Sequence, residues 1–468
     1  MASSLKFGTS GLRGLATDLV GSAARRYAAA FVRHLEATGQ AGTRRVYLAR
    51  DHRESSPPIL ADCAVAVRAA GFEPIDCGVL PTPALALHSM ALGGAAIMVT
   101  GSHIPADRNG LKFYVPTGEI TKDDEAGIAA ALSDDVPEGP GGAADEYAQA
   151  GDRYRQRYRR LLATDALSGW RIGVFEHSSV ARDLLVSLLT RAGATVVRLA
   201  RSETFIPVDT EAFSDAIFAP RHDWIAQHKL DAIVSTDGDG DRPLVIDATG
   251  EFVRGDVLGM IAARFVGVSR VVTPVTSNSA IEGVGWFTEV ERTRVGSPYV
   301  IAGMERVGQR GAVVGFEANG GTLLGSDVIV DNHTLSALPT RDAVLPILAV
   351  LATAKGRGLS LAGLVKSLPV RAALSDRLTD VPGERSAEFL RRLAEEPGYA
   401  ATFFVPVGEV DSLSSIDGLR FGLVSGDTVH YRASGNAPEL RCYVEGITAE
   451  RAEELLRWGL KAAETVVR

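Results

Sequence analysis

The sequence predicts an α/β fold in which three related segments precede an α+β segment. Stretches that begin near residues 44, 170 and 269 each run from a β-branched strand through a polar turn and a helix to a glycine and a second strand. Strands that alternate with helices indicate α/β layers. The stretches are too divergent for a solenoid. They are either three related domains or the strand–helix–strand units common to α/β proteins.

The remaining segments connect and close this pattern. Residues 133–147 are rich in proline, glycine and acids, which predicts an exposed linker. The helix expected over residues 152–162 has five arginines. They could bind phosphate, but a solvated face with an aromatic seam from Tyr154 and Tyr158 is the favoured interpretation. The last hundred residues run from a charged helix through strands to a closing helix, which predicts an α+β domain.

Composition limits the function classes. The chain of 468 residues is 46% hydrophobic and 23% charged, which is ordinary for a globular protein of several domains. Its net charge of −8 argues against nucleic acid as a partner. The longest apolar stretch, residues 343–354, predicts a buried helix too short to span a bilayer, and no secretory signal is visible. Cys63, Cys77 and Cys442 lack CxxC spacing, so we expect reduced thiols in a cytoplasmic protein without a membrane partner.

The clearest metal motif is STDGDGDRPLVID. Asp237, Asp239 and Asp241 alternate after an apolar run, and in a tight loop they can converge on one hard cation. An EF-hand needs glycine and glutamate where Arg242 and Ala248 stand, which excludes that motif. Three carboxylates suit a cation whose remaining ligand is a phosphate oxygen, which favours magnesium. The alternative is a solvated acidic turn.

A serine ends the apolar run in AAIMVTGSHIPADRNGLKFY. Ser102 follows Gly101 and precedes His103, and Lys112 lies ten positions further on. A hydroxyl at a strand end, beside a glycine and near cations, is well placed to carry a phosphoryl group.

Glycine-bearing loops offer further polar groups. The turn in YRASGNAPELR combines a guanidinium, a hydroxyl, an amide and backbone N–H groups, which could form a phosphate site or a plain strand-to-strand turn. Its residues are Arg432, Ser434, Gly435 and Asn436. In GFEANGG, Glu317 and Asn319 could bind sugar hydroxyls or belong to a simple turn. Arg13, among three glycines, could close over a phosphate or lie in a flexible terminus. Arg50 and Asp51 stand at a strand end just before a helix, where Asp51 could simply cap that helix.

Several of these motifs resemble those of the α-D-phosphohexomutases: TGSHIP with NGLKFY, DGDGDR, GFEANGG and RASGNAPELR, in this order, with KFGTSGLRG and the RD of LARD in support. No Walker A, GxGxxG, HExxH or GxSxG motif competes with them. The resemblance extends over essentially the whole chain. It implies an α/β fold class with three related α/β/α domains plus a C-terminal α+β domain around a central cleft. We place the domains at 1–148, 149–255, 256–367 and 368–468.

The resemblance also implies roles for the motif residues. Ser102 would cycle as a phosphoserine, and Mg2+ would bind Asp237, Asp239, Asp241 and the phosphoserine. Lys112 matches a proposed general base or acid, Arg13 and Arg242 match positions near the transferring phosphoryl group, and His103 belongs to the same catalytic set. Glu317 and Asn319 would bind the sugar, and the loop of Arg432, Ser434, Gly435 and Asn436 would bind the distal phosphate.

The chain departs from the family pattern at four places. Ile104 replaces the usual asparagine after the serine–histidine pair, and Asn436 stands where threonine is common. The sugar loop usually reads Glu-x-Ser-Gly-His, but Asn319 replaces its serine and Gly321 its histidine. A histidine proposed for proton transfer in some members is therefore missing, which gives Lys112 more weight.

The function implied is a phosphohexomutase that interconverts hexose 1-phosphate and hexose 6-phosphate through a phosphoserine and a hexose 1,6-bisphosphate, which also serves as activator. We favour mannose as the sugar, followed by glucose or both sugars, and glucosamine less. A metal-dependent serine phosphatase and a catalytically silent sugar-phosphate binder are the alternatives from other classes. A monomer or weak homodimer is expected.

Overall fold

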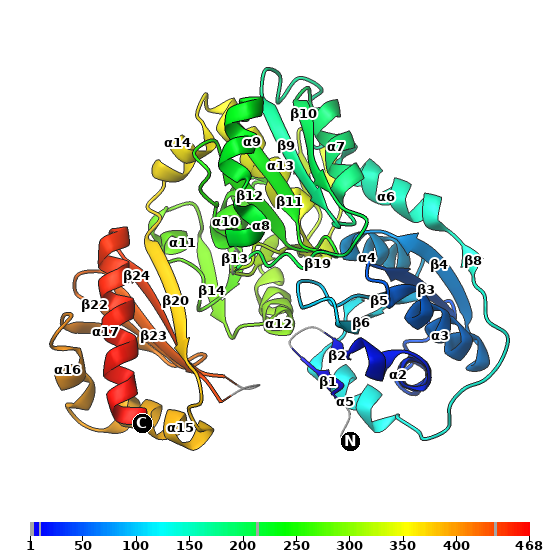
Figure 1. The fold of residues 1–468 in the computed structure, drawn as a ribbon, viewed down its shortest axis with the longest axis horizontal. Coiled ribbons are helices and arrows are strands. Elements are labelled where there is room, and N and C mark those ends of the chain that lie inside the picture. Colours follow the sequence, from blue (N-terminus) through cyan, green and yellow to red (C-terminus); the bar gives the residue numbers. More distant parts are fainter. Residues whose placement is uncertain (1–3, 9–10, 212–214, 435–437) are drawn as a thin grey trace. The chain divides into compact units, whose positions relative to one another are not determined.

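The computed structural model describes residues 4–8, 11–211, 215–434 and 438–468. The chain forms two compact units. Unit 1 comprises Met1–Val272 and Gly296–Ser367, and unit 2 comprises Thr273–Val295 and Leu368–Arg468. The third α/β segment, expected at 256–367, thus contributes to both units (Figure 1). The predicted α/β fold class is confirmed by mixed sheets flanked by helices.

The first sheet of unit 1 has the strand order β1-β2-β6-β5-β3-β4-β8, and β7 pairs with β6. Its strands are β1 (Lys6–Phe7), β2 (Leu12–Leu15), β3 (Arg45–Arg50), β4 (Glu73–Val79), β5 (Ala95–Val99), β6 (Arg108–Val115), β7 (Gly118–Glu119) and β8 (Ala144–Asp145). Its helices are α1 (Ala16–Leu19), α2 (Ser22–Ala37), α3 (Ser56–Ala69), α4 (Thr82–Ala91) and α5 (Lys122–Ala130). Strand β3 is parallel to β4 and β5, and β6 is antiparallel to β5.

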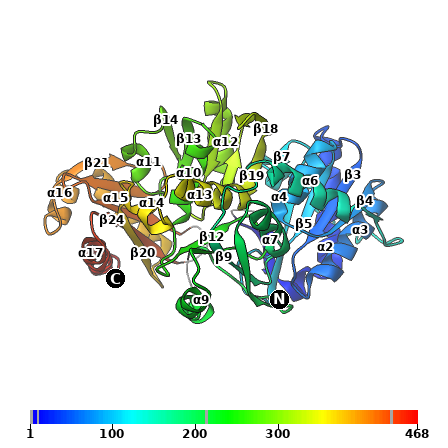
Figure 2. The same ribbon diagram turned by 90° about the horizontal axis from the view of Figure 1, so that it is seen from above.

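Helices cover both faces of this sheet because its central strands are apolar on both faces (Figure 2). Val46 and Leu48 pack into one core with residues of α2 and α3. Tyr47, which points the other way, contacts the ring of His88 on α4. The chain leaves β5 directly before Ser102, so the serine lies at the carboxyl end of a fully buried strand.

The expected linker is shorter than predicted. Residues 133–143 contain no helix or strand, but Ala144 and Asp145 form β8, which pairs with β4. Helix α6 (Tyr147–Arg159) follows at once. Its predicted aromatic seam is confirmed, because Tyr154 and Tyr158 are 1% and 2% exposed while the neighbouring arginines are exposed or half-buried.

A second sheet has the order β10-β9-β11-β12. Its elements are β9 (Arg171–His177), β10 (Thr195–Arg201), β11 (Ala232–Thr236) and β12 (Pro243–Asp247), with α7 (Arg182–Arg191), α8 (Asp215–Phe218) and α9 (Arg221–His228). Strands β10, β9 and β11 are parallel, and β12 returns antiparallel to β11. The loop between β11 and β12 therefore lies at the carboxyl end of β11, where it presents the acidic motif.

The third sheet has the order β14-β13-β15-β16-β19, and β17 and β18 form a separate hairpin. Its strands are β13 (Arg270–Pro274), β14 (Glu289–Thr293), β15 (Val313–Phe316), β16 (Thr322–Leu324) and β19 (Leu338–Asp342); the hairpin is β17 (Val328–Val330) and β18 (His333–Leu335). The helices are α10 (Gly255–Phe265), α11 (Ala280–Gly283), α12 (Ser297–Gly308), α13 (Val344–Gly356) and α14 (Leu361–Lys366). The apolar run at 343–354 is buried in α13, as predicted.

Unit 2 confirms the predicted α+β character of the C-terminal segment. Its antiparallel sheet has the order β20-β24-β23-β22-β21. The strands are β20 (Ala372–Leu378), β21 (Val410–Ser414), β22 (Leu419–Leu423), β23 (Thr428–Ala433) and β24 (Leu440–Gly446), with helices α15 (Gly383–Glu395), α16 (Tyr399–Phe404) and α17 (Ala449–Val467). Helix α17 packs along β20 and β24 (Figure 1).

Two smaller expectations concern membrane spans and cysteines. Within the described ranges, no helix combines the length and apolar character needed to cross a bilayer. Cys63, Cys77 and Cys442 are buried free thiols, and burial raises the pKa of each.

Candidate active site

Ser102 is held in a strained and fully buried position. Its φ of +54° lies in the left-handed region, which is costly for a residue with a Cβ atom. The hydroxyl donates a hydrogen bond to Asp237 Oδ2 at 2.6 Å and lies 3.3 Å from His103 Nδ1. The Ser102 N–H donates to Thr100 Oγ1 at 2.8 Å. The side chain is 0% exposed, so in this conformation the surrounding protein excludes water from the oxygen.

Arg53 fixes the loop that contains this serine. Its guanidinium is buried and donates to four backbone oxygens of the loop, at 2.6–3.0 Å. The acceptors belong to Ser102, Ile104, Pro105 and Arg108. A Cβ atom at Gly101 would lie 2.7 Å from Arg53 Cζ, so glycine is required next to the serine. We expect Arg53 to be a positioning residue, which the sequence did not indicate.

Asp51 supports the same loop and does not have the capping role expected of it. Helix α3 begins after Ser55 without a side-chain cap. The Asp51 carboxylate instead accepts hydrogen bonds from Thr100 Oγ1 at 2.7 Å, Ser56 Oγ at 2.6 Å and Arg53 Nε at 3.1 Å. Thr100 in turn accepts the Ser102 N–H, so Asp51 connects α3 to the serine through one hydroxyl.

The three aspartates of the β11–β12 loop converge as the motif predicts. One carboxylate oxygen of each lies within 4.8 Å of the others. Asp237 accepts the Ser102 hydroxyl through one oxygen and the backbone N–H groups of Asp241 and Arg242 through the other, at 3.2 Å each. Asp239 accepts a hydrogen bond from Thr82 Oγ1 at 2.5 Å.

Two oxygens of the aspartate triplet lack partners, which fits a cation site. Asp239 Oδ1 and Asp241 Oδ1 are buried, and no residue that the structure describes donates a hydrogen bond to them. Buried carboxylate oxygens left in this state are costly unless a cation neutralises them. Burial, with Asp239 and Asp241 adding repulsion, raises the pKa of Asp237 well above its usual value. Oxygen donors that are anionic and close together suit Mg2+.

Four predicted cationic or histidine side chains lie around this triplet. Lys112 on β6 donates to Asp239 and Asp241 at 2.5 and 2.6 Å. Burial, followed by repulsion from Arg242 and Arg341, lowers the pKa of Arg13 to about 10, which still leaves it charged at neutral pH. Arg242 is buried, and its Nε lies 3.9 Å from Asp241 Oδ1 without a hydrogen bond among the described residues.

His103 differs from these cations because it is neutral. Burial, followed by repulsion from Arg242 and Arg13, lowers its pKa to about 2. The imidazole can therefore accept or donate one hydrogen bond near the serine oxygen, but it does not contribute positive charge there.

The predicted sugar loop follows β15 and lies beside the aspartates. Glu317 and Asn319 are each 5% exposed. The Asn319 side-chain oxygen accepts the Gly321 N–H at 3.0 Å, so its amide nitrogen is the group left for a hydroxyl. Glu317 Oε2 accepts from Arg341 Nη1 at 3.2 Å.

Arg341 is a site residue that the motifs missed. It lies at the end of β19, is 3% exposed, and joins the two acidic loops, because it also donates to Asp241 Oδ2 at 2.9 and 3.1 Å. An arginine two positions before the apolar run at 343–354 was the available signal. Gly321, where the family usually has histidine, provides its space: a Cβ atom there would lie 2.7 Å from Arg341 Cγ and Cδ.

Replacing Gly321 with alanine is expected to lower the free energy of unfolding by about 1–3 kcal/mol, because the new methyl group overpacks against Arg341. The matched control is Gly356→Ala at the end of α13, where a Cβ atom meets nothing within 4 Å. Urea unfolding of both variants measures the difference. Equal stability of the two variants would show that Arg341 does not need the space above Gly321.

The predicted phosphate loop lies in unit 2. Arg432 on β23 forms an ion pair with Asp417 at 2.9 Å, and the backbone N–H of Ser434 donates to Glu439 at 2.9 Å. Gly435 and Asn436 lie outside the described residues. The structure thus brings together Ser102, His103, Lys112, Arg13, Arg242, Glu317, Asn319 and the three aspartates within unit 1, and the phosphate loop stays a prediction.

Comparisons with known proteins agree with the motif resemblance. Residues 4–136 match the family model for phosphoglucomutase/phosphomannomutase α/β/α domain I, and residues 254–372 match the model for domain III. A phosphomannomutase of Sinorhizobium fredii (strain NBRC 101917 / NGR234) is 49% identical over 97% of this chain and 98% of its own. A phosphomannomutase of Salmonella muenchen is 42% identical over 96% and 94%. The crystal structure of a phosphoglucomutase/phosphomannomutase family protein from Burkholderia thailandensis superimposes with a TM-score of 0.76 at 22% identity, over 98% of each chain.

Proposed function

Because the chain belongs to the phosphoglucomutase/phosphomannomutase family and is an enzyme, we propose that it is a phosphohexomutase that interconverts mannose 1-phosphate and mannose 6-phosphate. Glucose phosphates are the second substrate class. The phosphoryl group would pass through Ser102, and a hexose 1,6-bisphosphate would be both intermediate and activator. The four domains proposed from the sequence, at 1–148, 149–255, 256–367 and 368–468, are the framework for this reaction.

One observation supports this proposal above all others. The Ser102 hydroxyl lies 2.6 Å from Asp237 in a buried cluster with Lys112, Arg13 and Arg242. A sugar-phosphate binder needs no such hydroxyl among metal-ligand carboxylates. A phosphatase would pass the phosphoryl group to water and release inorganic phosphate, which separates it from a mutase.

The transfer itself depends on position and charge. The bond from the Ser102 oxygen to phosphorus breaks, and a bond forms from phosphorus to a free hydroxyl oxygen of the hexose monophosphate. Arg13 and Arg242 stabilise the charge on the moving group. Mg2+, held by Asp237, Asp239 and Asp241, would supply further positive charge at this place. Arg53 and Asp51 maintain the strained φ of Ser102, which fixes the direction in which its side-chain oxygen points.

A proton must leave the sugar hydroxyl and return to the serine oxygen. Lys112 is the proposed carrier, because its nitrogen lies beside Asp239 and Asp241 and no histidine occupies position 321. As the neutral amine it would accept the proton of the sugar hydroxyl, and as the ammonium it would return a proton to the serine oxygen. Glu317 and the Asn319 amide nitrogen would bind sugar hydroxyls, and Arg341 fixes the Glu317 carboxylate for that purpose. His103 would contribute a neutral hydrogen bond.

The bisphosphate must then turn over, so that its other phosphate faces Ser102. The loop of Arg432, Ser434, Gly435 and Asn436 would hold whichever phosphate is distal, through a guanidinium and backbone N–H groups. Hydroxyl ligands that serve both orientations cannot discriminate strongly at C2, so both mannose and glucose phosphates are expected to react. The asparagine and glycine of the sugar loop give less support to glucosamine phosphate.

The test is a comparison of kcat/KM for mannose 1-phosphate, glucose 1-phosphate and glucosamine 1-phosphate, with Mg2+ and a hexose 1,6-bisphosphate present. We expect mannose and glucose phosphates to react well and glucosamine phosphate poorly. Each isomer formed should match the substrate consumed, without inorganic phosphate. Stoichiometric release of inorganic phosphate would instead identify a phosphatase, and binding without turnover would identify a silent binder.

A further inference from the structure

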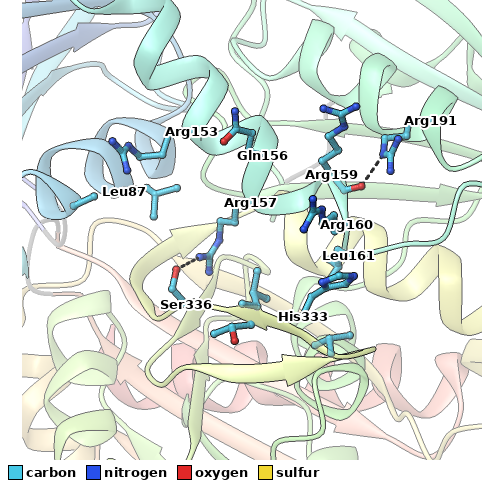
Figure 3. A pocket seen from close by; sticks show the side chains of 14 residues that line it. Leu87, Arg153, Gln156, Arg157, Arg159, Arg160, Leu161, Arg191, His333 and Ser336 are labelled. Carbon is cyan, nitrogen blue, oxygen red and sulfur yellow. Dashed lines mark hydrogen bonds between the residues drawn. The ribbon is translucent and has the colours of Figure 1, made fainter.

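A large pocket of unit 1 lies apart from the residues assigned to the active site. It has a volume of about 890 Å³ and lies between α4, α6, α7 and the β17–β18 hairpin (Figure 3). None of the residues that line it belongs to the serine, aspartate or sugar loops. Its polar lining consists mainly of arginines, namely Arg153, Arg157, Arg159, Arg160 and Arg191.

The positive charge of this pocket is not balanced. The lining contains five arginines and His333 but no aspartate or glutamate. Within the described ranges, none of the five arginines forms an ion pair with a carboxylate. Arg155 on the same helix α6 differs from them, since it does not line this pocket and it forms an ion pair with Asp152. The pocket therefore attracts anions in a chain whose net charge is −8.

Arg157 lines the pocket with a guanidinium group that has one unsatisfied donor. Its Nε donates to Tyr158 Oη at 3.1 Å and its Nη1 to Ser336 Oγ at 3.0 Å, which fixes the guanidinium plane (Figure 3). Its third nitrogen, Nη2, is buried and has no acceptor in the described part of the chain. A buried donor without a partner is costly, so a shift of the side chain that brings Nη2 to an anionic oxygen in the pocket would be favourable.

The hydrogen bonds of Tyr158 make this arrangement rigid. Tyr158 and Tyr154 both donate to the carboxylate of Asp342, which also accepts the backbone N–H of Val344 at the start of α13. Arg157 is thus connected to the buried core through Tyr158, while its second hydrogen bond goes to the exposed Ser336. Arg191 donates to the backbone oxygen of Arg159, which holds the end of α6 against α7 (Figure 3).

We propose that this pocket binds a small organic molecule that carries a diphosphate group. Guanidinium groups match phosphate oxygens with paired hydrogen bonds, and the arginines spread along this pocket can bind more than one phosphate group (Figure 3). Leu87, Leu161 and Leu335 give the pocket an apolar part for the organic portion. The volume is within the range of small-molecule sites. The concave, locally confined charge favours a small ligand over nucleic acid, which needs an extended basic surface.

The test uses ADP and inorganic diphosphate as probes, in buffer without Mg2+, with binding measured by calorimetry on the full chain. The pocket variant is Arg159→Ala with Arg160→Ala, whose side chains are exposed. The control, Arg391→Ala with Arg392→Ala, removes an exposed arginine and its half-buried neighbour from α15. We expect ADP to bind more tightly than inorganic diphosphate, and the pocket variant to weaken ADP binding at least about tenfold while the control leaves it unchanged.

A third variant distinguishes this pocket from the active site. Arg13→Ala should leave ADP binding unchanged, and hydrogen exchange should slow at residues 153–161 and 330–336 when ADP is added. The proposal is overturned if ADP does not bind, if both double variants bind it equally, or if only Arg13→Ala weakens it. Tighter binding of a single-stranded oligonucleotide in competition with ADP would assign the surface to nucleic acid instead. Equal affinity for ADP and inorganic diphosphate would contradict the proposal that the ligand has an organic portion as well as a diphosphate group. The outcome is independent of the proposed mutase activity.

Discussion

Replacing Ser102 with alanine is expected to lower kcat for the mutase reaction by a factor of at least about 10³, because the oxygen proposed to carry the phosphoryl group beside Asp237 is removed. Binding of hexose phosphate should survive, since Arg13, Lys112 and Glu317 are unchanged. A coupled assay of mannose 1-phosphate isomerisation measures the first effect, and calorimetry with the same compound measures the second.

The control for this variant is Ser89→Ala on α4. Ser89 is also fully buried, and its hydroxyl donates to the backbone oxygen of Ala86, away from the aspartates. The control should retain turnover close to that of the unmodified chain. Turnover of Ser102→Ala at the level of the control would contradict the assignment of the nucleophile.

Replacing Asp237 with asparagine is expected to lower kcat at least about 100-fold and to raise the Mg2+ concentration needed for half-maximal activity. The substitution keeps the shape and the oxygen that accepts the N–H groups of Asp241 and Arg242, but it removes one charge from the cation site. Activity of the unmodified chain should disappear with a chelator and return with Mg2+. A Mg2+ titration of both proteins measures the change.

Asp223→Asn provides the matched control, because Asp223 is exposed in the first turn of α9. It should leave the Mg2+ dependence unchanged. If Asp237→Asn and Asp223→Asn have the same Mg2+ dependence, the aspartate triplet is not the metal site. If the unmodified chain is fully active after chelation, the metal itself is unnecessary.

The sequence was most informative where a motif directly follows a strand. Ser102, Asp237 and Glu317 follow β5, β11 and β15, and the carboxyl ends of strands are where α/β proteins place ligands. Alternation of acids after an apolar run was enough to predict that Asp237, Asp239 and Asp241 converge. The burial of α13 could also be predicted, because the burial of a helix depends largely on how apolar its own residues are.

Residues that act through long-range contacts could not be found in this way. Arg53 bonds to backbone oxygens about fifty positions further along the chain, and its local sequence, HRESS, has the composition of a charged turn. Arg341 reaches Asp241 across one hundred positions. The expected capping by Asp51 was wrong for the same reason, since Thr100 and Arg53 compete for its carboxylate once the sheet has formed. Local propensity does not contain such contacts.

The sequence also did not show that residues 273–295 belong to unit 2. This segment opens as a repeat of the strand–helix pattern, yet it belongs to unit 2. Asn278 bonds to the backbone of Arg371, and the backbone N–H of Ser279 donates to Glu445. Pairings of this kind depend on tertiary packing of distant segments, so a repeat in the sequence did not reveal them.

The central claim is that the Ser102 oxygen receives and returns the phosphoryl group. It is tested most directly by incubating the unmodified chain with a hexose 1,6-bisphosphate labelled in its phosphates, followed by peptide mass spectrometry and then by addition of unlabelled mannose 1-phosphate. We predict that the label lies on Ser102 alone and moves to the added sugar without release of inorganic phosphate. Label on another residue, or label on Ser102 that leaves only as inorganic phosphate, would contradict the mechanism.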